Sequence, residues 1–231
     1  LNLYNGSSYD MKIADPGGVF ISWLSNSSVY AQKILADGSL AWGSDGALLV
    51  QDRAQGYSGD DNYSYDANMQ IVKINGNYVV VFYCSDSVSE SVCAQKIDDS
   101  GSVGGGNWGQ YGIAVSNLGR SNTSYPYVVS SGSKIWVSFG GDSGYVIQSI
   151  DESGQKINTV SASPYEVKYM ASDGNGGIFT VGGSSSMGVQ RYDSSGTIVW
   201  NMTYSGYDSN QKYILVNSGV GIATALWNNR V

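Results

Sequence analysis

The stretch from Val29 to Val50 reads VYAQKILADGSLAWGSDGALLV and decides the fold. Apolar and polar residues alternate on either side of Gly38, a pattern that predicts a strand, a tight turn and a second strand. Gln32 stands six residues before this turn glycine. The same spacing recurs for three later pairs: Gln95 and Gly101, Gln148 and Gly154, Gln190 and Gly196. Four copies of one arrangement indicate a repeat protein.

A second element precedes the Gln-bearing one and consists of two apolar runs joined by a short glycine turn. Its turn glycines are Gly17, Gly76, Gly132, Gly174 and Gly219. Their separation of roughly 40 to 60 residues is typical of four-stranded propeller blades. We therefore predict an all-β fold, a five-bladed β-propeller of four-stranded antiparallel blades, forming one domain over residues 1–231. The expected blades span 9–50, 68–117, 125–161, 166–204, and 211–231 together with 1–5.

The fifth copy is incomplete, because only Asn228–Val231 follow its hairpin. An unpaired sheet edge is an aggregation hazard. We expect residues 1–5 to pair with the C-terminal hairpin and complete the last blade. The alternative is that these terminal strands pair with another molecule, which would give self-assembly by strand exchange.

The composition excludes several classes of function. The net charge is −7 and no Lys/Arg cluster offsets it, which argues against nucleic acid as a partner. The longest apolar run, Tyr78 to Cys84, is too short to span a membrane. The chain has no histidine, which excludes the usual Ser-His-Asp machinery and His-based metal sites. We expect no metal centre and no cofactor from these features.

Cys84 and Cys93 flank a short segment between two expected strands. We predict a disulfide between them, and the alternative is two buried thiols. A disulfide would indicate an oxidising compartment, so we expect an extracellular or cell-surface protein. The candidate glycosylation sites, in N-x-S/T triplets, are Asn5, Asn26, Asn62, Asn122 and Asn201.

The quoted repeat, with its Y-A-Q-K-I core and its W-G-x-x-G segment, resembles the repeats of secreted bacterial and archaeal β-propeller proteins. The second copy keeps AQKIDDSG and NWGQYGIAVS, whereas later copies keep only the glutamine and the turn. The resemblance implies a propeller fold and secretion. Repeats of this type serve in surface, adhesive and glycan-related proteins.

The connection from Gln55 to Asn68 is long for a propeller loop and is the most distinctive candidate binding site. Its candidate ligand-binding residues are Tyr57, Asp60, Asp61, Tyr63, Tyr65 and Asp66. Tyrosine rings stack on sugar C–H faces while polar groups bind hydroxyls. The same acids could hold calcium, although their spacing is not that of an EF-hand. A solvated loop without a ligand is the remaining alternative.

We expect a non-catalytic extracellular module that recognises glycans or a surface protein through these loops. One alternative is a structural subunit of a surface sheath or filament. The other is a carboxylate-dependent glycosidase, which needs two acids near the inner strands. Asp10 and Glu166 are the only acids near the start of an expected inner strand. The recurring tryptophans and glutamines are expected to be structural.

Overall fold

The part of the chain that the computed structural model describes is all-β apart from one short 3₁₀ turn, η1 (Gly106–Trp108). The model describes residues 8–14, 18–52, 69–85, 90–116, 126–141, 144–161, 166–183, 186–205, 212–217 and 222–227. Two compact units divide the chain. The first holds residues 1–120 with 153–155, and the second holds 121–152 with 156–231.

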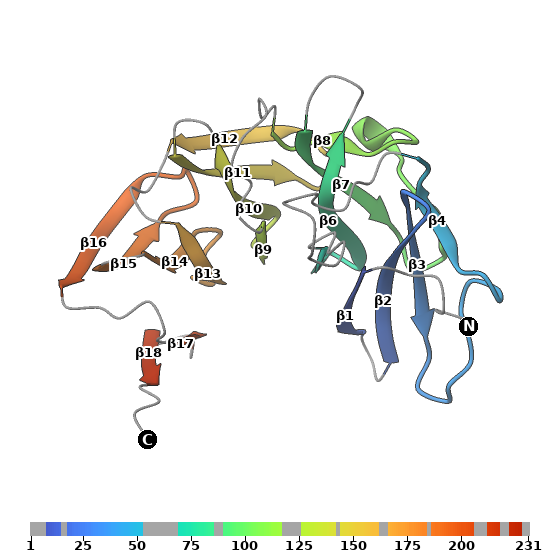
Figure 1. Cartoon of the computed structure of the whole chain (residues 1–231), viewed down its shortest axis with the longest axis horizontal. Helices are drawn as coiled ribbons and strands as arrows, with labels where there is room; N and C mark the ends of the chain where they lie inside the picture. The colour runs from blue at the N-terminus through green and yellow to red at the C-terminus, as the bar shows by residue number, and fades with distance from the viewer. Residues whose placement is uncertain are drawn as a thin grey trace, which may run out of the picture. The chain divides into compact units, whose positions relative to one another are not determined.

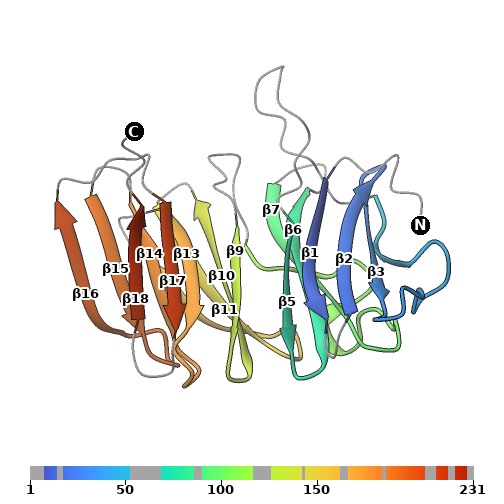
Figure 2. The ribbon, with the colours of Figure 1, turned by 90° about the horizontal axis from the view of Figure 1, so that it is seen from below.

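The first unit contains two four-stranded antiparallel sheets (Figure 1). Sheet one consists of β1 (Ser8–Ala14), β2 (Gly18–Ser25), β3 (Ser28–Ile34) and β4 (Ala47–Val50). Sheet two consists of β5 (Gln70–Ile74), β6 (Asn77–Ser85), β7 (Glu90–Ile97) and β8 (Ile113–Ala114). In both sheets each strand pairs with the next one along the chain, and the first strands, β1 and β5, lie side by side (Figure 2).

The second unit repeats this order. Sheet three consists of β9 (Tyr127–Ser131), β10 (Lys134–Gly141), β11 (Gly144–Asp151) and β12 (Lys156–Ser161). Sheet four consists of β13 (Val167–Ser172), β14 (Ile178–Gly182), β15 (Ser186–Tyr192) and β16 (Ile198–Ser205). A hairpin of β17 (Lys212–Asn217) and β18 (Ile222–Trp227) follows, and β13 lies beside both β9 and β17.

The all-β prediction is therefore confirmed, as is the order of four consecutive antiparallel strands in a sheet. The described residues form four such sheets and one hairpin, so the prediction of five four-stranded blades is only partly met. The predicted strand of residues 1–5 lies outside the described residues.

Turn chemistry explains where the strands reverse. Asn75 and Gly76 both have positive φ (46° and 83°), as a two-residue hairpin turn between β5 and β6 requires. In the turn after β7, the Asp98 carboxylate accepts hydrogen bonds from the backbone N–H groups of Ser100 and Ser102 at 2.9 and 3.0 Å. Asp193 makes the same contacts in the turn after β15. These acids therefore close turns.

The four repeated glutamines are buried, at 0 to 5% exposure, and are structural as expected. Gln32 and Gln95 donate from the side-chain amide to carbonyl oxygens of the segment that leads into the fourth strand, those of Gly43 at 2.7 Å and Gly109 at 3.0 Å. Gln148 donates to the Asn158 carbonyl within β12 at 2.8 Å. In sheets one and two the amide thus fixes the connection before a fourth strand that begins late.

Neighbouring sheets pack through apolar faces. In the first unit Phe20 stacks on Tyr78, with ring centroids 4.3 Å apart, and both are fully buried. In the second unit Trp136, Ile147, Ile178 and Tyr192 form the core between sheets three and four. Alternation in the second and third strands of these sheets places these side chains on the face toward the neighbouring sheet.

Three tryptophans contact a residue of a neighbouring sheet and are structural, as expected. Trp42 donates its indole N–H to the Asp99 carbonyl at 3.3 Å, and Trp136 donates to the Gly176 carbonyl at 3.1 Å. Trp108 is fully buried and lies against Gly154, in the turn of residues 153–155 that clusters with the first unit. Trp23 stacks instead on Tyr30 of its own sheet.

Candidate functional site

Glu166 immediately precedes the inner strand β13, as the sequence predicted for the start of a blade. Its carbonyl oxygen accepts a hydrogen bond from the backbone N–H of Gly183 at 3.0 Å. A Cβ at Gly182 would collide with the same carbonyl. Gly183 has φ of 134°, which side chains rarely adopt. The Gly182–Gly183 pair therefore lets the end of β14 approach closely and fixes the backbone of Glu166.

The Glu166 carboxylate forms an ion pair with Lys168, with 2.6 Å between Oε1 and Nζ. The side chain of Glu166 is 23% exposed and that of Lys168 is 36% exposed. Lys168 stands two residues after Glu166, at a register irregularity between Val167 and Tyr169. The carboxylate is thus held in a defined position and remains open to solvent on one side.

Tyr145 lies near this pair, at the start of β11. Burial raises the pKa of the Tyr145 hydroxyl, and the negative charge of Glu166 raises it further. A hydroxyl whose pKa is raised stays protonated and can donate a hydrogen bond to an oxygen of a ligand or of a carboxylate.

Two further tyrosines lie against each other where β9 packs beside β13. Tyr127 begins β9, and its ring lies 6.0 Å from that of Tyr169 in β13, with the two planes tilted by 43°. Tyr169 is 38% exposed. An exposed tyrosine face can stack on the C–H face of a sugar ring. Tyr127, Tyr145, Glu166, Lys168 and Tyr169 together are called the Glu166 cluster below, and all belong to the second unit.

The sequence analysis identified Glu166 but missed the other four members of this cluster. The signal was present, because tyrosines open both the YVV stretch at 127 and the YVIQ stretch at 145. Strand starts that follow blade connections share one end of a meander sheet, so Tyr127, Tyr145 and Glu166 could have been grouped. Lys168 could have been found as the cation two residues after the acid.

The second acid of the sequence prediction, Asp10, lies in β1 of the first unit, where its backbone pairs with Ser22. Ser22 is fully buried, and among the described residues its hydroxyl has no hydrogen-bond partner. The predicted ligand residues Tyr57, Asp60, Asp61, Tyr63, Tyr65 and Asp66 all lie outside the described residues. Binding of glycans or calcium by that loop therefore stays a prediction.

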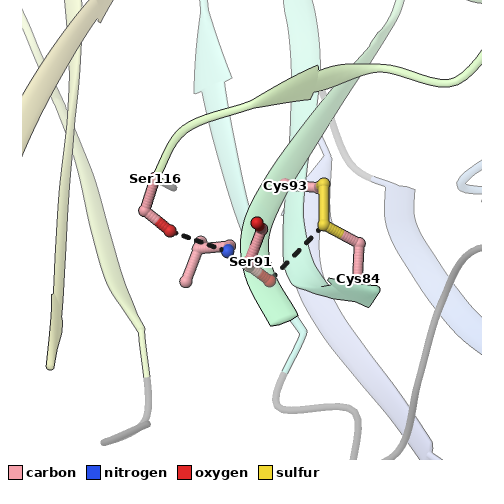
Figure 3. Close-up of a disulfide and its surroundings, with 5 residues drawn as sticks. Cys84, Ser91, Cys93 and Ser116 are labelled. Atoms are coloured by element: carbon pink, nitrogen blue, oxygen red, sulfur yellow. Dashed lines mark hydrogen bonds between the residues drawn. A yellow bond between two sulfur atoms is a disulfide. The ribbon is translucent and has the colours of Figure 1, made fainter. Parts of the chain in front are cut away.

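The predicted disulfide between Cys84 and Cys93 is present, with 5.8 Å between the two Cα atoms. It links β6 to β7 near the end of the hairpin where the two strands are connected (Figure 3). Cys84 Sγ lies 3.4 Å from the Ser91 carbonyl oxygen, and the Ser116 hydroxyl accepts a hydrogen bond from the Val92 N–H at 2.9 Å. The disulfide therefore fixes β7 to β6 on one side, and the Ser116 contact fixes β7 on its other side.

Two of the predicted glycosylation sites can be placed. Asn26 lies in the turn between β2 and β3 and Asn201 lies in β16, and both are exposed. Asn5, Asn62 and Asn122 lie outside the described residues. Within the described residues no group of three His, Cys, Asp or Glu side chains could hold a metal ion. The described part of the chain also holds no helix with the length and apolar character that a membrane crossing needs.

No protein-family model matches the chain, and no curated protein matches its sequence. Solved structures do resemble it. The fold is β-propeller-like. Polysaccharide lyase Uly1 superposes with a TM-score of 0.50 at 13% identity, over 94% of this chain and 54% of the lyase. A family 117 glycoside hydrolase of Zobellia galactanivorans gives a TM-score of 0.44 at 11% identity, over 94% of this chain and 77% of that chain.

A glycoside hydrolase of the GH130 family, which targets β-1,2 mannosidic linkages in Candida mannan, gives a TM-score of 0.45 at 10% identity. The match covers 97% of this chain and 84% of that chain. The likeness to polysaccharide lyase Uly1 corrects the main functional prediction from the sequence. We expected a non-catalytic recognition or adhesion module, whereas that structure belongs to an enzyme, so that expectation is wrong.

Proposed function

We propose that the chain is a carboxylate-dependent glycosidase. The observation that carries the proposal is the Glu166 carboxylate, which is paired with Lys168, is partly open to solvent and lies near Tyr145. Gly183 fixes the backbone of Glu166. The names of the similar structures support the substrate class, because they identify a polysaccharide lyase and glycoside hydrolases. The physical arrangement supports the chemistry, since glycosidases combine acids with groups that stack on sugars.

The ion pair with Lys168 holds the Glu166 carboxylate in a defined position. Glycoside hydrolysis needs one carboxyl group that protonates the leaving oxygen and one carboxylate that acts as base or nucleophile. Glu166 would supply one of these two groups. Tyr145 would donate a hydrogen bond to a hydroxyl of the sugar.

The test is hydrolysis of a polysaccharide panel by the full chain, measured as new reducing ends. We expect Glu166→Gln to lower kcat at least about 100-fold on the best substrate, the usual size of a lost acid–base group. Glu152→Gln, a turn residue between β11 and β12, is the matched control and should retain activity. Unfolding of both variants would be followed by circular dichroism to exclude misfolding.

Three outcomes would overturn the proposal. The first is that no polysaccharide of the panel is cleaved, and the second is that Glu166→Gln retains the rate of the unchanged chain. The third is a product with a carbon–carbon double bond, which would show elimination instead of hydrolysis.

We also propose the finer architecture that the repeats predict: a five-bladed propeller whose last blade is completed by residues 1–5. Five glycine-turn hairpins in the sequence support it. Deleting residues 1–5 should lower the unfolding temperature if they pair with β18, and an unchanged temperature would contradict the pairing. The disulfide supports secretion, as does the resemblance to secreted propeller repeats. Detection of the chain only inside intact cells would overturn this location.

A further inference from the structure

The turn between β13 and β14, residues 173–177, contains an asparagine followed by a glycine, Asn175–Gly176. This pair is chemically labile, because the backbone nitrogen of the second residue can attack the side-chain amide carbon of the first, and glycine has no side chain to hinder the approach. The same pair occurs in the turn between β5 and β6, as Asn75–Gly76. A third pair, Asn5–Gly6, lies outside the described residues. The two described turns therefore offer the same chemistry in two backbone settings.

The backbone conformation of Asn75 opposes this attack. Its φ of 46° is left-handed, and in this conformation the next backbone nitrogen lies on the opposite side of the Cα–C bond from Cβ. The side-chain amide carbon of Asn75 is therefore turned away from the Gly76 nitrogen. Strand pairing keeps it so, because Ile74 pairs with Asn77 directly beside this two-residue turn. The attack needs a rotation that breaks the hairpin.

Asn175 lacks this obstacle. It is exposed, and it is not among the residues with positive φ. Its backbone N–H donates to the Asp173 carboxylate at 2.8 Å. Within the described part of the chain, neither the side-chain amide of Asn175 nor the backbone N–H of Gly176 has a hydrogen-bond partner. The side chain can therefore rotate toward a nitrogen whose proton no other group holds.

The peptide that would react lies where sheet four meets sheet three. The Gly176 carbonyl oxygen accepts a hydrogen bond from the indole N–H of Trp136 at 3.1 Å, and Trp136 belongs to the core between the two sheets. The Gly177 carbonyl oxygen accepts one from the Ser131 hydroxyl at 2.6 Å. The Gly177 N–H donates at 2.9 Å to the Asp173 carboxylate, whose side chain is 2% exposed. The junction therefore depends on where the main chain places residues 176 and 177.

We propose that Asn175 is a deamidation site, and that its isoaspartate product loosens the junction of sheets three and four. The Gly176 nitrogen bonds to Asn175 Cγ, its proton passes to water, and the side-chain nitrogen leaves as ammonia. Water then opens the cyclic imide at the side-chain carbonyl, which gives aspartate, or at the main-chain carbonyl, which gives isoaspartate. Isoaspartate adds a methylene group to the main chain, so the peptide groups of Gly176 and Gly177 cannot all keep their partners.

Storage of the full, disulfide-bonded chain in mildly alkaline buffer tests the reaction, because the attacking nitrogen must lose its proton. Mass spectrometry of peptides measures the exchange of amide for acid at Asn175 and at Asn75 in the same sample. In the folded chain Asn175 should react at least about tenfold faster, because the fixed turn raises the barrier at Asn75. In guanidinium chloride, where both turns are lost, the two rates should be similar. The proposal is overturned if Asn175 stays intact in the folded chain, or if Asn75 reacts as fast there.

The unfolding temperature of the stored chain tests the loosened junction. The unchanged chain should gain a population that unfolds at lower temperature, in proportion to the isoaspartate detected by enzymatic methylation. Asn175→Gln should keep the unfolding temperature of its fresh sample, because its longer side chain forms the imide far more slowly, and Asn75→Gln is the matched control that should age like the unchanged chain. Asn175→Asp copies the aspartate product and should unfold like the fresh chain. An unchanged unfolding temperature after conversion of Asn175 to isoaspartate would overturn the loosened junction.

Discussion

Tyr192→Phe isolates the cost of ionising a buried hydroxyl. Tyr192 is fully buried between sheets three and four, and its hydroxyl donates to Gln190 Oε1 at 2.7 Å. Burial raises the pKa of Tyr192 from 10.0 to about 12. The unfolded chain therefore loses this proton at lower pH than the folded chain, so the stabilisation is complete below pH 10 and is lost as the pH rises toward 12.

The size of the effect follows from the two pKa values of Tyr192. Each unit of difference corresponds to about 1.4 kcal/mol, so about 3 kcal/mol is lost once both states are ionised. At about pH 11 the loss is roughly 1 kcal/mol. At neutral pH the Tyr192→Phe variant should be less stable than the unchanged chain by about 1–2 kcal/mol, because the buried Gln190 oxygen loses its donor. The gap between the two proteins should therefore close near pH 11.

Urea unfolding followed by circular dichroism at pH 8, 10 and 11 would measure the gap. Tyr111→Phe is the matched control, since Tyr111 is 46% exposed, and its gap to the unchanged chain should stay constant. A Tyr192→Phe gap that is also constant from pH 8 to 11 would refute the reasoning, because it would mean that folding does not raise the pKa of Tyr192.

Other variants probe the repeated contacts. Gln95→Ala should lower the free energy of unfolding by about 3 kcal/mol in urea titrations, because it strands buried backbone groups, and a loss below about 1 kcal/mol would contradict that role. Gly101→Ala should cost at least about 1 kcal/mol more than Gly174→Ala in the same assay. The two glycines have similar φ (90° and 81°), but only Gly101 has Trp42 against its Cβ position, so equal costs would show that the contact is loose. Reducing the disulfide should lower the free energy of unfolding by about 2–3 kcal/mol, as expected for a short closed loop, and an unchanged value would show that the reduced state gains no freedom.

The sequence predicted the strand order because it depends on short-range patterns. Alternation around Gly38, the Asn75–Gly76 turn and the glutamine spacing each fix local structure. The Cys84–Cys93 disulfide could be predicted because the two cysteines lie in neighbouring strands of one hairpin, β6 and β7. Glu166 could be predicted because its position depends only on where an inner strand starts.

The tyrosines of the Glu166 cluster could not be predicted from short-range sequence patterns. Tyr127 and Tyr169 lie 42 residues apart in the sequence, and their contact depends on how β9 packs beside β13. The raised pKa of Tyr145 comes from burial and from the charge of Glu166. Such properties arise between sheets, and a pattern within one repeat does not report them.

The buried glutamine amides have a consequence for how this chain can vary. Gln32, Gln95 and Gln148 reach carbonyl groups that lie 11, 14 and 10 residues further along the chain. One anchoring group thus accepts connections of three lengths without change to the strand that carries it. Insertions and deletions can therefore accumulate in the connection between the third and fourth strands. This connection needs only to place one carbonyl oxygen within reach of the glutamine amide, while the inner strands keep their lengths.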